Sequence, residues 1–211
     1  MHGWLCDNPT GADQLRWKPL NLGQPGPGQV LVAVRAASLN FPDLLTVENK
    51  YQIKPPLPFV PGAEYAGVVE AVGPDVSHLQ PGQHVAVIGA AGGFATHAMA
   101  SAPHCLPLPA SVPFEHAAAF AFTYGTTHHA LIDRAALKAG ETVLVLGAAG
   151  GVGTSAIQVA KAAGARVIAG VSSDEKAAFC KTLGADDTLN YSQEDVRERL
   201  KVLTPGRGPD V

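Results

Sequence analysis

The stretch from Thr142 to Gly164, TVLVLGAAGGVGTSAIQVAKAAG, decides the fold of the second half of the chain. Its first five residues, Thr142–Leu146, are uncharged and either apolar or β-branched, which predicts a strand buried on both faces. After a glycine-rich turn, apolar residues recur at the spacing of one helix face, and Gly164 predicts the end of that helix. The recurring residues are Val152, Ala156, Val159, Ala160 and Ala163. The predicted order is strand, glycine turn, helix.

The glycine turn, Gly147–Gly153, predicts a dinucleotide site. In such a unit the glycines permit a tight turn, a close approach of the backbone to a pyrophosphate, and close packing of the helix on the strand. The helix N-terminus adds unpaired N–H groups and the positive end of its dipole. The alternative is a flexible Gly/Ala loop, but the flanking strand and helix favour the nucleotide site. The residues expected to contact the cofactor here are Ala149, Gly150, Gly151, Val152 and Gly153.

Composition excludes several classes of function. The 211 residues are 46% hydrophobic and 16% charged, with a formal net charge of −3, so neither nucleic acid nor an anionic membrane is an expected partner. Three scattered cysteines, Cys6, Cys105 and Cys180, indicate a reducing compartment rather than a disulfide framework. The N-terminus lacks the regions of a signal peptide, and no segment reaches the ~18 apolar residues of a membrane helix. We therefore expect a cytoplasmic protein.

The sequence pattern changes near Phe122. Residues 1–122 are rich in Pro and Gly and contain short strand-like segments, which predicts a mostly β domain that forms a partly closed barrel. These segments are Gln29–Ala36, Gly67–Val72 and His84–Ile88. Residues 123–211 alternate strands with helices, which predicts a parallel sheet with helices on both faces.

Two further strand–helix units follow the glycine turn. Strands are expected at Arg166–Val171 and Thr188–Asn190, and helices at Ser173–Leu183 and Ser192–Leu203. Ser172-x-x-Glu175 is interpreted as a capping box, and Ser192-Gln-Glu-Asp195 resembles one.

The last residues, Thr204–Val211, are typical of a loop that enters a fourth strand beside the first, in the strand order 3-2-1-4-5-6. A chain ending there would leave Thr142–Leu146 as an open apolar edge, which invites aggregation. We therefore expect the sequence to be the front part of a longer protein, with its Rossmann domain incomplete at the C-terminus, and we do not expect the 211-residue form to function alone.

Four motifs together resemble the medium-chain dehydrogenase/reductases, in their zinc-free quinone oxidoreductase (zeta-crystallin-like) branch. They are Ser38-Leu-Asn40-Phe-Pro-Asp43-Leu-Leu, Tyr51-Gln-Ile-Lys-Pro-Pro-Leu-Pro-Phe-Val-Pro61-Gly62-Ala-Glu64-Tyr-Ala-Gly67, Thr123-Tyr-Gly-Thr126 and the glycine turn. The resemblance runs along essentially the whole chain. It implies a GroES-like catalytic domain at 1–122, the first half of a Rossmann dinucleotide-binding domain at 123–211, and a homodimer when the protein is full length.

The resemblance also implies zinc-independent chemistry. Zinc-dependent relatives carry Gly-His-Glu where this chain has Gly62-Ala63-Glu64, and they place a cysteine ligand near the position of Asn40. A zinc site of the alcohol dehydrogenase type needs two Cys, one His and an open position, and Ala63 cannot bind a metal. The adjacent His128 and His129 would point to different faces of a helix, so one ion is not expected to bind both. No metal is expected.

Without a Lewis acid the substrate must accept hydride unaided. Quinones and α,β-unsaturated carbonyls do so because the arriving charge delocalises onto oxygen, and the protein then positions the nicotinamide and places hydrogen-bond donors near that oxygen. The resemblance implies that Asn40 and Tyr51 face the nicotinamide and substrate, and that Thr123 holds the nicotinamide side. Tyr51 could instead be an ordinary loop aromatic and Asn40 an Asx-turn residue. Glu64 and Asp43 are expected to support the fold.

The choice of nicotinamide cofactor depends on residues after the second strand. Asp174 lies near the distance of ~20 residues at which a carboxylate binds the ribose of NAD, but acids are also common in a first helical turn for dipole reasons. The hydroxyls of Ser172 and Ser173, with Lys176, suit a 2′-phosphate, although Lys176 could also be a solvated helix residue. The resemblance places Ser172, Lys176 and Tyr191 at the 2′-phosphate and adenosine end. We therefore expect NADPH.

The sequence as a whole predicts an NADPH-dependent oxidoreductase that transfers hydride to a quinone without a metal. An NADPH-dependent enone or enoyl-thioester reductase with the same hydride geometry is the alternative within enzymes. A non-catalytic NADPH-binding protein is the alternative outside them. The expected partner is a small molecule, and not nucleic acid or a membrane.

Overall fold

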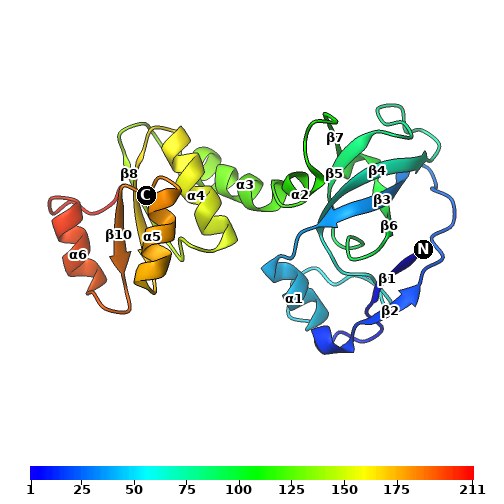
Figure 1. The fold of residues 1–211 in the computed structure, drawn as a ribbon, viewed down its shortest axis with the longest axis horizontal. Coiled ribbons are helices and arrows are strands. Elements are labelled where there is room, and N and C mark those ends of the chain that lie inside the picture. The colour runs from blue at the N-terminus through cyan, green and yellow to red at the C-terminus, as the bar shows by residue number, and fades with distance from the viewer. The chain divides into compact units, whose positions relative to one another are not determined.

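The structure, a computed structural model, describes residues Met1–Val211. The chain divides into two compact units, Met1–Phe122 and Thr123–Val211, and each is described by itself (Figure 1). The first unit is built on antiparallel strands and the second on parallel strands. No helix in the chain combines the length and the apolar character that are needed to cross a membrane.

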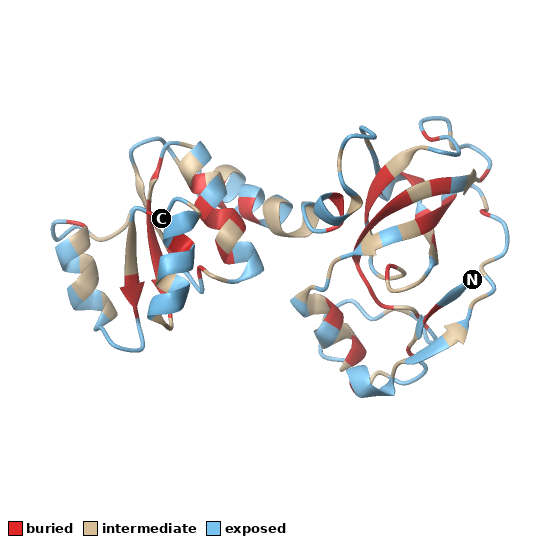
Figure 2. Ribbon diagram, in the orientation of Figure 1, coloured by how far each residue is buried: buried red, intermediate tan, exposed pale blue.

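The first unit contains a five-stranded antiparallel sheet with the strand order β6-β3-β4-β5-β7. The strands are β3 (Gln29–Ala37), β4 (Glu64–Val72), β5 (His84–Ile88), β6 (His97–Ser101) and β7 (Cys105–Leu108). Figure 2 shows buried residues along these strands, and Val30, Val32 and Val85 are fully buried among them. The three strands predicted in this half are confirmed.

Smaller elements complete the first unit. The pair β1 (His2–Leu5) and β2 (Arg16–Pro19) forms a separate antiparallel ribbon. The helices are the 3-10 turns η1 (Ala12–Gln14) and η2 (Ala102–His104), α1 (Phe41–Val47) and α2 (Phe114–Ala117). The helix α1 was not predicted, and it begins where the Asn40 N–H donates a 2.8 Å hydrogen bond to Asp43 Oδ2.

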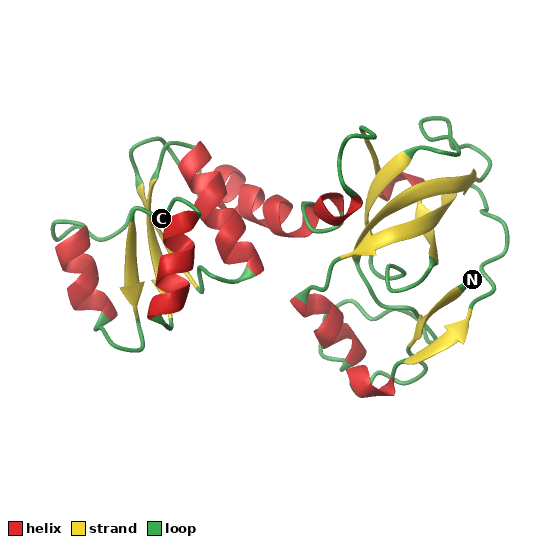
Figure 3. Cartoon of the chain, viewed as in Figure 1, coloured by secondary structure: helices red, strands yellow, loops and turns green.

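The second unit is a three-stranded parallel sheet with helices in the connections, in the strand order β10-β9-β8 (Figure 3). The strands are β8 (Thr142–Leu146), β9 (Arg166–Val171) and β10 (Asp187–Asn190). The helices are α3 (Ala121–His128), the π-helical turn η3 (His129–Arg134), α4 (Gly151–Ala162), α5 (Asp174–Thr182) and α6 (Val196–Leu203). The predicted bounds of the first two strands are confirmed at both ends.

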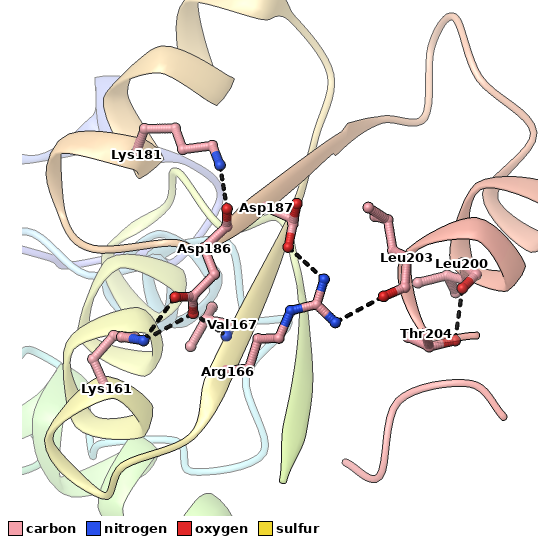
Figure 4. Close-up of polar contacts among 9 residues, drawn as sticks. All are labelled: Lys161, Arg166, Val167, Lys181, Asp186, Asp187, Leu200, Leu203 and Thr204. Carbon is pink, nitrogen blue, oxygen red and sulfur yellow. Dashed lines mark hydrogen bonds and ion pairs between the residues drawn. The ribbon is translucent and has the colours of Figure 1, made fainter. Parts of the chain in front are cut away.

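Helices contact both faces of this sheet, as predicted. Val143 and Val167 share one buried core with Ile157 of α4 and Cys180 of α5. Arg166 lies one residue before Val167, so its side chain is on the opposite face of β9. Its guanidinium donates hydrogen bonds of 2.7 Å to the Leu203 carbonyl at the end of α6 and 2.6 Å to Asp187 (Figure 4).

A second polar cluster joins α4, β9 and the loop before β10. Lys161 Nζ lies 2.9 Å from both carboxylate oxygens of Asp186, the Val167 N–H donates to Asp186 Oδ2 at 2.7 Å, and Lys181 donates to the Asp186 carbonyl (Figure 4). Burial raises the pKa of Asp186, but the Lys161 and Val167 hydrogen bonds and the charges of Lys161 and Arg166 outweigh it. The pKa of this carboxyl therefore lies below its usual value.

Both predicted starts of the later helices are wrong. The cap of α5 is Ser173, not Ser172, because the Ser173 hydroxyl accepts a 3.3 Å hydrogen bond from the Lys176 N–H. The helix α6 starts after Asp195, whose side chain caps it, instead of at Ser192. Hydrogen bonds among residues 190–194, including Gln193 N–H to the Asn190 carbonyl, fold that segment into a turn and delay the helix.

The prediction of burial is also wrong at two positions beside the glycine turn. Val152 is 48% exposed, because the first turn of α4 begins at the carboxyl end of β8, where no strand covers it. Leu146, the last residue of β8, is 64% exposed. The predicted face of α4 is buried at Ala156 and Ala160, and Gly164 follows the helix with a φ of +82°.

The last residues of the chain lie along the outer edge of β8. The Leu144 N–H donates a 2.8 Å hydrogen bond to the Val211 carbonyl, and the Asp210 N–H donates one of 2.8 Å to the Thr142 carbonyl. Asp210 Oδ2 also accepts from the Thr142 N–H at 2.8 Å. The segment therefore occupies the place predicted for a fourth strand, and the edge is less open than predicted.

Candidate functional site

The glycine turn between β8 and α4 has two glycines with different structural roles. A Cβ atom on Gly153 would lie 2.5 Å from the Gly147 carbonyl oxygen and 2.6 Å from Ala148 Cα, so only glycine permits this packing. A Cβ atom on Gly150, the N-cap of α4, would meet only the Gly147 oxygen, at 3.4 Å. Gly153 is therefore required by the fold, whereas Gly150 borders open space that a ligand can use.

A small cavity of about 170 Å³ lies beside this turn. Its lining comes from the turn, the end of β9, α5 and the residue after β10: Gly147, Ala149, Gly150, Val171, Lys176 and Tyr191. The carboxyl ends of parallel strands meet at this edge of the sheet, which is where nucleotides bind in such folds. The structure thus brings together four of the predicted cofactor residues, Ala149, Gly150, Lys176 and Tyr191.

The positive charge at this cavity comes from Lys176. Its Nζ donates a 3.1 Å hydrogen bond to the Ser172 hydroxyl. Ser172 is a neutral partner, so this contact leaves the ammonium charge uncompensated. Of the two predicted serines, only Ser172 contacts the ammonium group, because the Ser173 hydroxyl is occupied as the α5 cap.

The carboxylate of Asp174, at the start of α5, is held by β10. Its Oδ1 accepts a 2.8 Å hydrogen bond from the Asn190 amide, and Asn190 is only 5% exposed. The Asn190 amide oxygen in turn accepts from the Ser192 N–H at 3.1 Å. Asp174 therefore has a structural partner, and it does not line the cavity of Lys176.

Thr123 lies against the glycine turn at the start of the second unit. A Cβ on Gly151 would lie 3.4 Å from Thr123 Cγ2, and the Ser155 hydroxyl donates a 3.2 Å hydrogen bond to the Thr123 carbonyl. The predicted residues Thr123, Gly151 and Val152 are thus near the turn, although they do not line the cavity beside Lys176.

In the first unit, Asn40 belongs to a partly buried polar cluster with Ser38 and the buried Glu64. The Asn40 amide Nδ2 donates to Ser38 Oγ at 2.8 Å and to Glu64 Oε2 at 3.2 Å, and Ser38 Oγ donates to Glu64 Oε2 at 2.6 Å. Glu64 is 1% exposed, and its other oxygen accepts from the Phe122 N–H at 2.8 Å. The sequence did not predict that Ser38 and Glu64 contact Asn40; the only signal was their presence in two of the resembling motifs.

Asp43 lies under the same loop and is 5% exposed. It accepts hydrogen bonds from the N–H groups of Asn40, at 2.8 Å, and of Ala63, at 3.0 Å. Burial raises the pKa of the Asp43 carboxyl, backbone N–H groups offset this only in part, and the negative charge of Glu64 raises it further. These contacts support the prediction that Asp43 serves the fold.

Asn40 and Tyr51 line different cavities of the first unit. Asn40 lines one of about 320 Å³ whose walls are mainly apolar, including Leu39, Phe41 and Phe94. This cavity adjoins a larger one of about 660 Å³ that contains Trp4 and Trp17 and shares Leu39 and Phe94 with it. Tyr51 lines a third cavity, of about 410 Å³, which has more polar walls. Within this unit the structure does not bring Asn40 and Tyr51 into one pocket.

Comparisons with known proteins agree with this architecture. Residues 26–110 match the model described as alcohol dehydrogenase GroES-like domain, and residues 151–211 match the one described as zinc-binding dehydrogenase. A probable oxidoreductase from Mycobacterium abscessus is 38% identical, with a TM-score of 0.90, and the match covers 99% of this chain and 67% of that one. The chain belongs to the medium-chain dehydrogenase/reductase family. The GroES-like and Rossmann-type architecture predicted from the sequence is thereby confirmed.

Two further members of the medium-chain dehydrogenase/reductase family illustrate the similarity. The quinone oxidoreductase-like protein 2 homolog of Nematostella vectensis is 41% identical over 188 residues, which are 88% of this chain and 51% of that protein. The quinone oxidoreductase of Escherichia coli, solved in complex with NADPH, is 32% identical with a TM-score of 0.88, over 98% of this chain and 64% of that one. The chain thus spans about half the length of the curated relatives it matches.

The potential metal ligands of this medium-chain dehydrogenase/reductase do not gather at one place in the structure. No group of three or more His, Cys, Asp or Glu side chains is arranged to hold an ion. At the position of the histidine in zinc-dependent relatives, Ala63 contributes only a buried methyl group and a backbone N–H that is bonded to Asp43.

Proposed function

We propose that this protein is an NADPH-dependent oxidoreductase that reduces a quinone without a metal ion. The observation that carries the proposal is the cavity beside the glycine turn, which residues of the turn, including Gly150, line together with Lys176 and Tyr191. In this proposal residues 1–122 form the catalytic domain and residues 123–211 the first half of the cofactor domain, the full-length protein is a homodimer, and the location is cytoplasmic.

The residues around the glycine turn fit a phosphorylated dinucleotide. Open space beside Gly150 leaves room for a pyrophosphate, and the α4 N-terminus directs N–H groups and a positive dipole end toward it. Lys176 and the Ser172 hydroxyl offer hydrogen-bond donors to a 2′-phosphate, and Tyr191 offers its ring to the adenosine. A carboxylate for the 2′-hydroxyl of NADH is missing from this cavity, because Asp174 is bonded to Asn190. These features favour NADPH, which is also bound in the E. coli relative.

The first unit offers apolar surroundings and fixed polar groups to a substrate. When bound, NADPH supplies a hydride. The walls near Asn40, including Phe41 and Phe94, are apolar and suit a flat apolar ring. Because the Ala63 side chain cannot bind a Lewis acid, the proposed acceptor delocalises the arriving charge itself, as a quinone does. In this proposal Asn40 and Thr123 position the nicotinamide, and Tyr51 contacts the substrate side.

Steady-state kinetics of the full-length protein test the proposal. We expect NADPH oxidation to depend on a naphthoquinone acceptor, with a larger kcat/KM than for a short enone. A larger kcat/KM for the enone would favour the enone or enoyl-thioester reductase. Tight NADPH binding without oxidation by either acceptor would favour the non-catalytic protein.

A further inference from the structure

The Tyr51 cavity, the space of about 410 Å³ that Tyr51 lines, has one positive charge and no negative charge in its wall. Lys54 is the only Lys, Arg, His, Asp or Glu residue that lines it. Asn8, Thr10 and Asn49 line it as well. An ammonium group only donates hydrogen bonds, and hydroxyl and amide side chains can donate too. The polar part of this wall therefore suits a ligand group that accepts hydrogen bonds and carries negative charge.

Two acids adjoin lining residues in the sequence, but neither neutralises Lys54. Asp7 Oδ2 lies 2.6 Å from Lys18 Nζ, and Glu48 Oε2 lies 2.8 Å from Lys50 Nζ. None of the ion pairs in the structure includes Lys54. The protein therefore leaves the positive charge of Lys54 uncompensated.

Backbone hydrogen bonds fix the walls of the Tyr51 cavity. After α1, the N–H groups of Lys50 and Tyr51 both donate to the Leu45 carbonyl, at 2.7 and 3.1 Å. Further along the same segment, Phe59 pairs with Cys6 through two backbone hydrogen bonds of 2.7 and 3.1 Å. This pair holds the segment against the loop that follows β1. The cavity is therefore bounded by backbone that is anchored on both sides.

The rest of the wall is apolar. Ile53, Leu57 and Phe59 line the Tyr51 cavity, and Ile53 and Leu57 are 54% and 52% exposed. A ligand that covers such side chains removes apolar surface from water, which favours binding. The cavity thus combines apolar surface that suits an aromatic ring with a cation that suits an anion.

We infer that the Tyr51 cavity binds the anionic substituent of an aromatic acceptor, with Lys54 as the residue that selects for the charge. This inference rests on the proposed function, in which Tyr51 contacts the substrate side. It narrows the substrate class from quinones in general to quinones that carry a carboxylate, a sulfonate or a similar acidic group. Lys54 is exposed, so water and salt screen its charge, and the expected selection is moderate.

Calorimetric titration of the full-length protein tests the inference without cofactor or turnover. The probes are naphthalene-2-sulfonate, the uncharged naphthalene-2-sulfonamide and inorganic sulfate. The variants are Lys54→Gln, which removes the charge, and Lys54→Arg, which keeps it. The matched control is Lys138→Gln, which removes an exposed lysine outside the cavity.

We expect the wild-type protein to bind the sulfonate about fivefold more tightly than the sulfonamide. This preference should disappear in Lys54→Gln, remain in Lys54→Arg and Lys138→Gln, and shrink as salt is added. No binding of the sulfonate, equal affinities for the two naphthalene probes, or a preference that survives Lys54→Gln would overturn the inference. Sulfate that binds as tightly as naphthalene-2-sulfonate would also overturn it, because the site would then hold free anions and not an aromatic acceptor.

Steady-state kinetics separates this inference from the proposed function. In Lys54→Gln, kcat/KM for 1,4-naphthoquinone-2-sulfonate should fall about fivefold through KM, and kcat/KM for 1,4-naphthoquinone should not change. Reduction of both quinones with the same dependence on Lys54 would overturn the inference and leave the proposed function intact. Absence of turnover with both quinones would refute the proposed function, and the calorimetric titration would still decide whether the cavity binds an aromatic anion.

Discussion

The carboxylate of Asp174 accepts a 2.8 Å hydrogen bond from the buried amide of Asn190, which joins the start of α5 to the end of β10. Two residues further along α5, Lys176 contacts only the neutral hydroxyl of Ser172 through its ammonium group at 3.1 Å. Asp174, the acid at the spacing typical of NAD binding, therefore has a structural hydrogen-bond partner, while Lys176 lines the cavity at the glycine turn. We therefore expect substitution of Lys176 to change cofactor binding and substitution of Asp174 to leave it unchanged.

Replacing Asp174 by Asn should leave the dissociation constants of both NADPH and NADH unchanged within about twofold. A twofold change corresponds to about 0.4 kcal/mol of binding free energy. The reason is that the carboxylate bonds to Asn190 and does not line the cavity. Fluorescence titration of the two reduced cofactors measures this directly. A selective loss of NADH affinity would show that Asp174 binds the ribose hydroxyl.

Replacing Lys176 by Ala should weaken NADPH binding by about 1–3 kcal/mol, because a charge-assisted hydrogen bond to the 2′-phosphate is lost. NADH binding should change little. The matched control is Lys138→Ala, which removes one exposed lysine of the same unit outside the cavity. An equal loss for NADPH and NADH would remove the assignment of Lys176 to the phosphate.

Substitutions at Gly150 and Gly153 should affect different properties of the protein, namely NADPH binding and thermal stability. Gly150→Val should fold, since its Cβ meets only one atom at 3.4 Å, but it should abolish NADPH binding by filling the open space. Gly153→Ala should instead lower the melting temperature, because its Cβ would lie 2.5 Å from the Gly147 oxygen. Thermal unfolding and cofactor titration of both variants distinguish the effects. NADPH affinity that survives Gly150→Val would contradict the location of the pyrophosphate.

The lowered pKa of Asp186 gives a pH-dependent contribution to stability. As the pH falls, the Asp186 carboxyl of the unfolded chain takes up a proton near its ordinary pKa of 3.8, and that of the folded chain does so at a lower pH. The contribution to stability is therefore present above pH 3.8 and is lost as the pH falls through the pKa of the folded state. Asp186→Asn should lower the free energy of unfolding by about 1 kcal/mol at neutral pH, a modest value because the side chain is partly exposed. Urea unfolding at several pH values should show this difference shrinking in acid; a constant difference would contradict the assignment.

The second unit was largely predictable because its determinants are local. Val143–Leu146 and Val167–Val171 are uninterrupted segments without polar side chains, and the strands that contain them, β8 and β9, have the predicted ends. The error at Ser172 shows the limit of such reasoning. Ser172 and Ser173 are both candidates for the N-cap from the sequence. Only the backbone geometry selects Ser173, whose Oγ accepts a hydrogen bond from the Lys176 N–H.

The environment of Asn40 was not predictable from local patterns. Ser38 and Glu64 are separated by 26 residues in the sequence, and their hydrogen bond forms only because the end of β3 and the start of β4 pair in register, with Ala37 opposite Tyr65. The resemblance drew attention to both motifs but did not specify the direction of the hydrogen bonds between them. That direction follows from the contact in which the Ser38 hydroxyl donates its single hydrogen to Glu64, which only the three-dimensional structure reveals.

The most direct test of the central claim is NADPH oxidation by a naphthoquinone in the full-length protein after exhaustive treatment with a metal chelator. The claim is that a phosphate-binding glycine turn with Lys176 holds the cofactor and that the acceptor alone stabilises the incoming charge. The expected result is a kcat unchanged by removal of metal and unchanged by added zinc. Turnover that disappears with the chelator and returns with zinc would contradict the account.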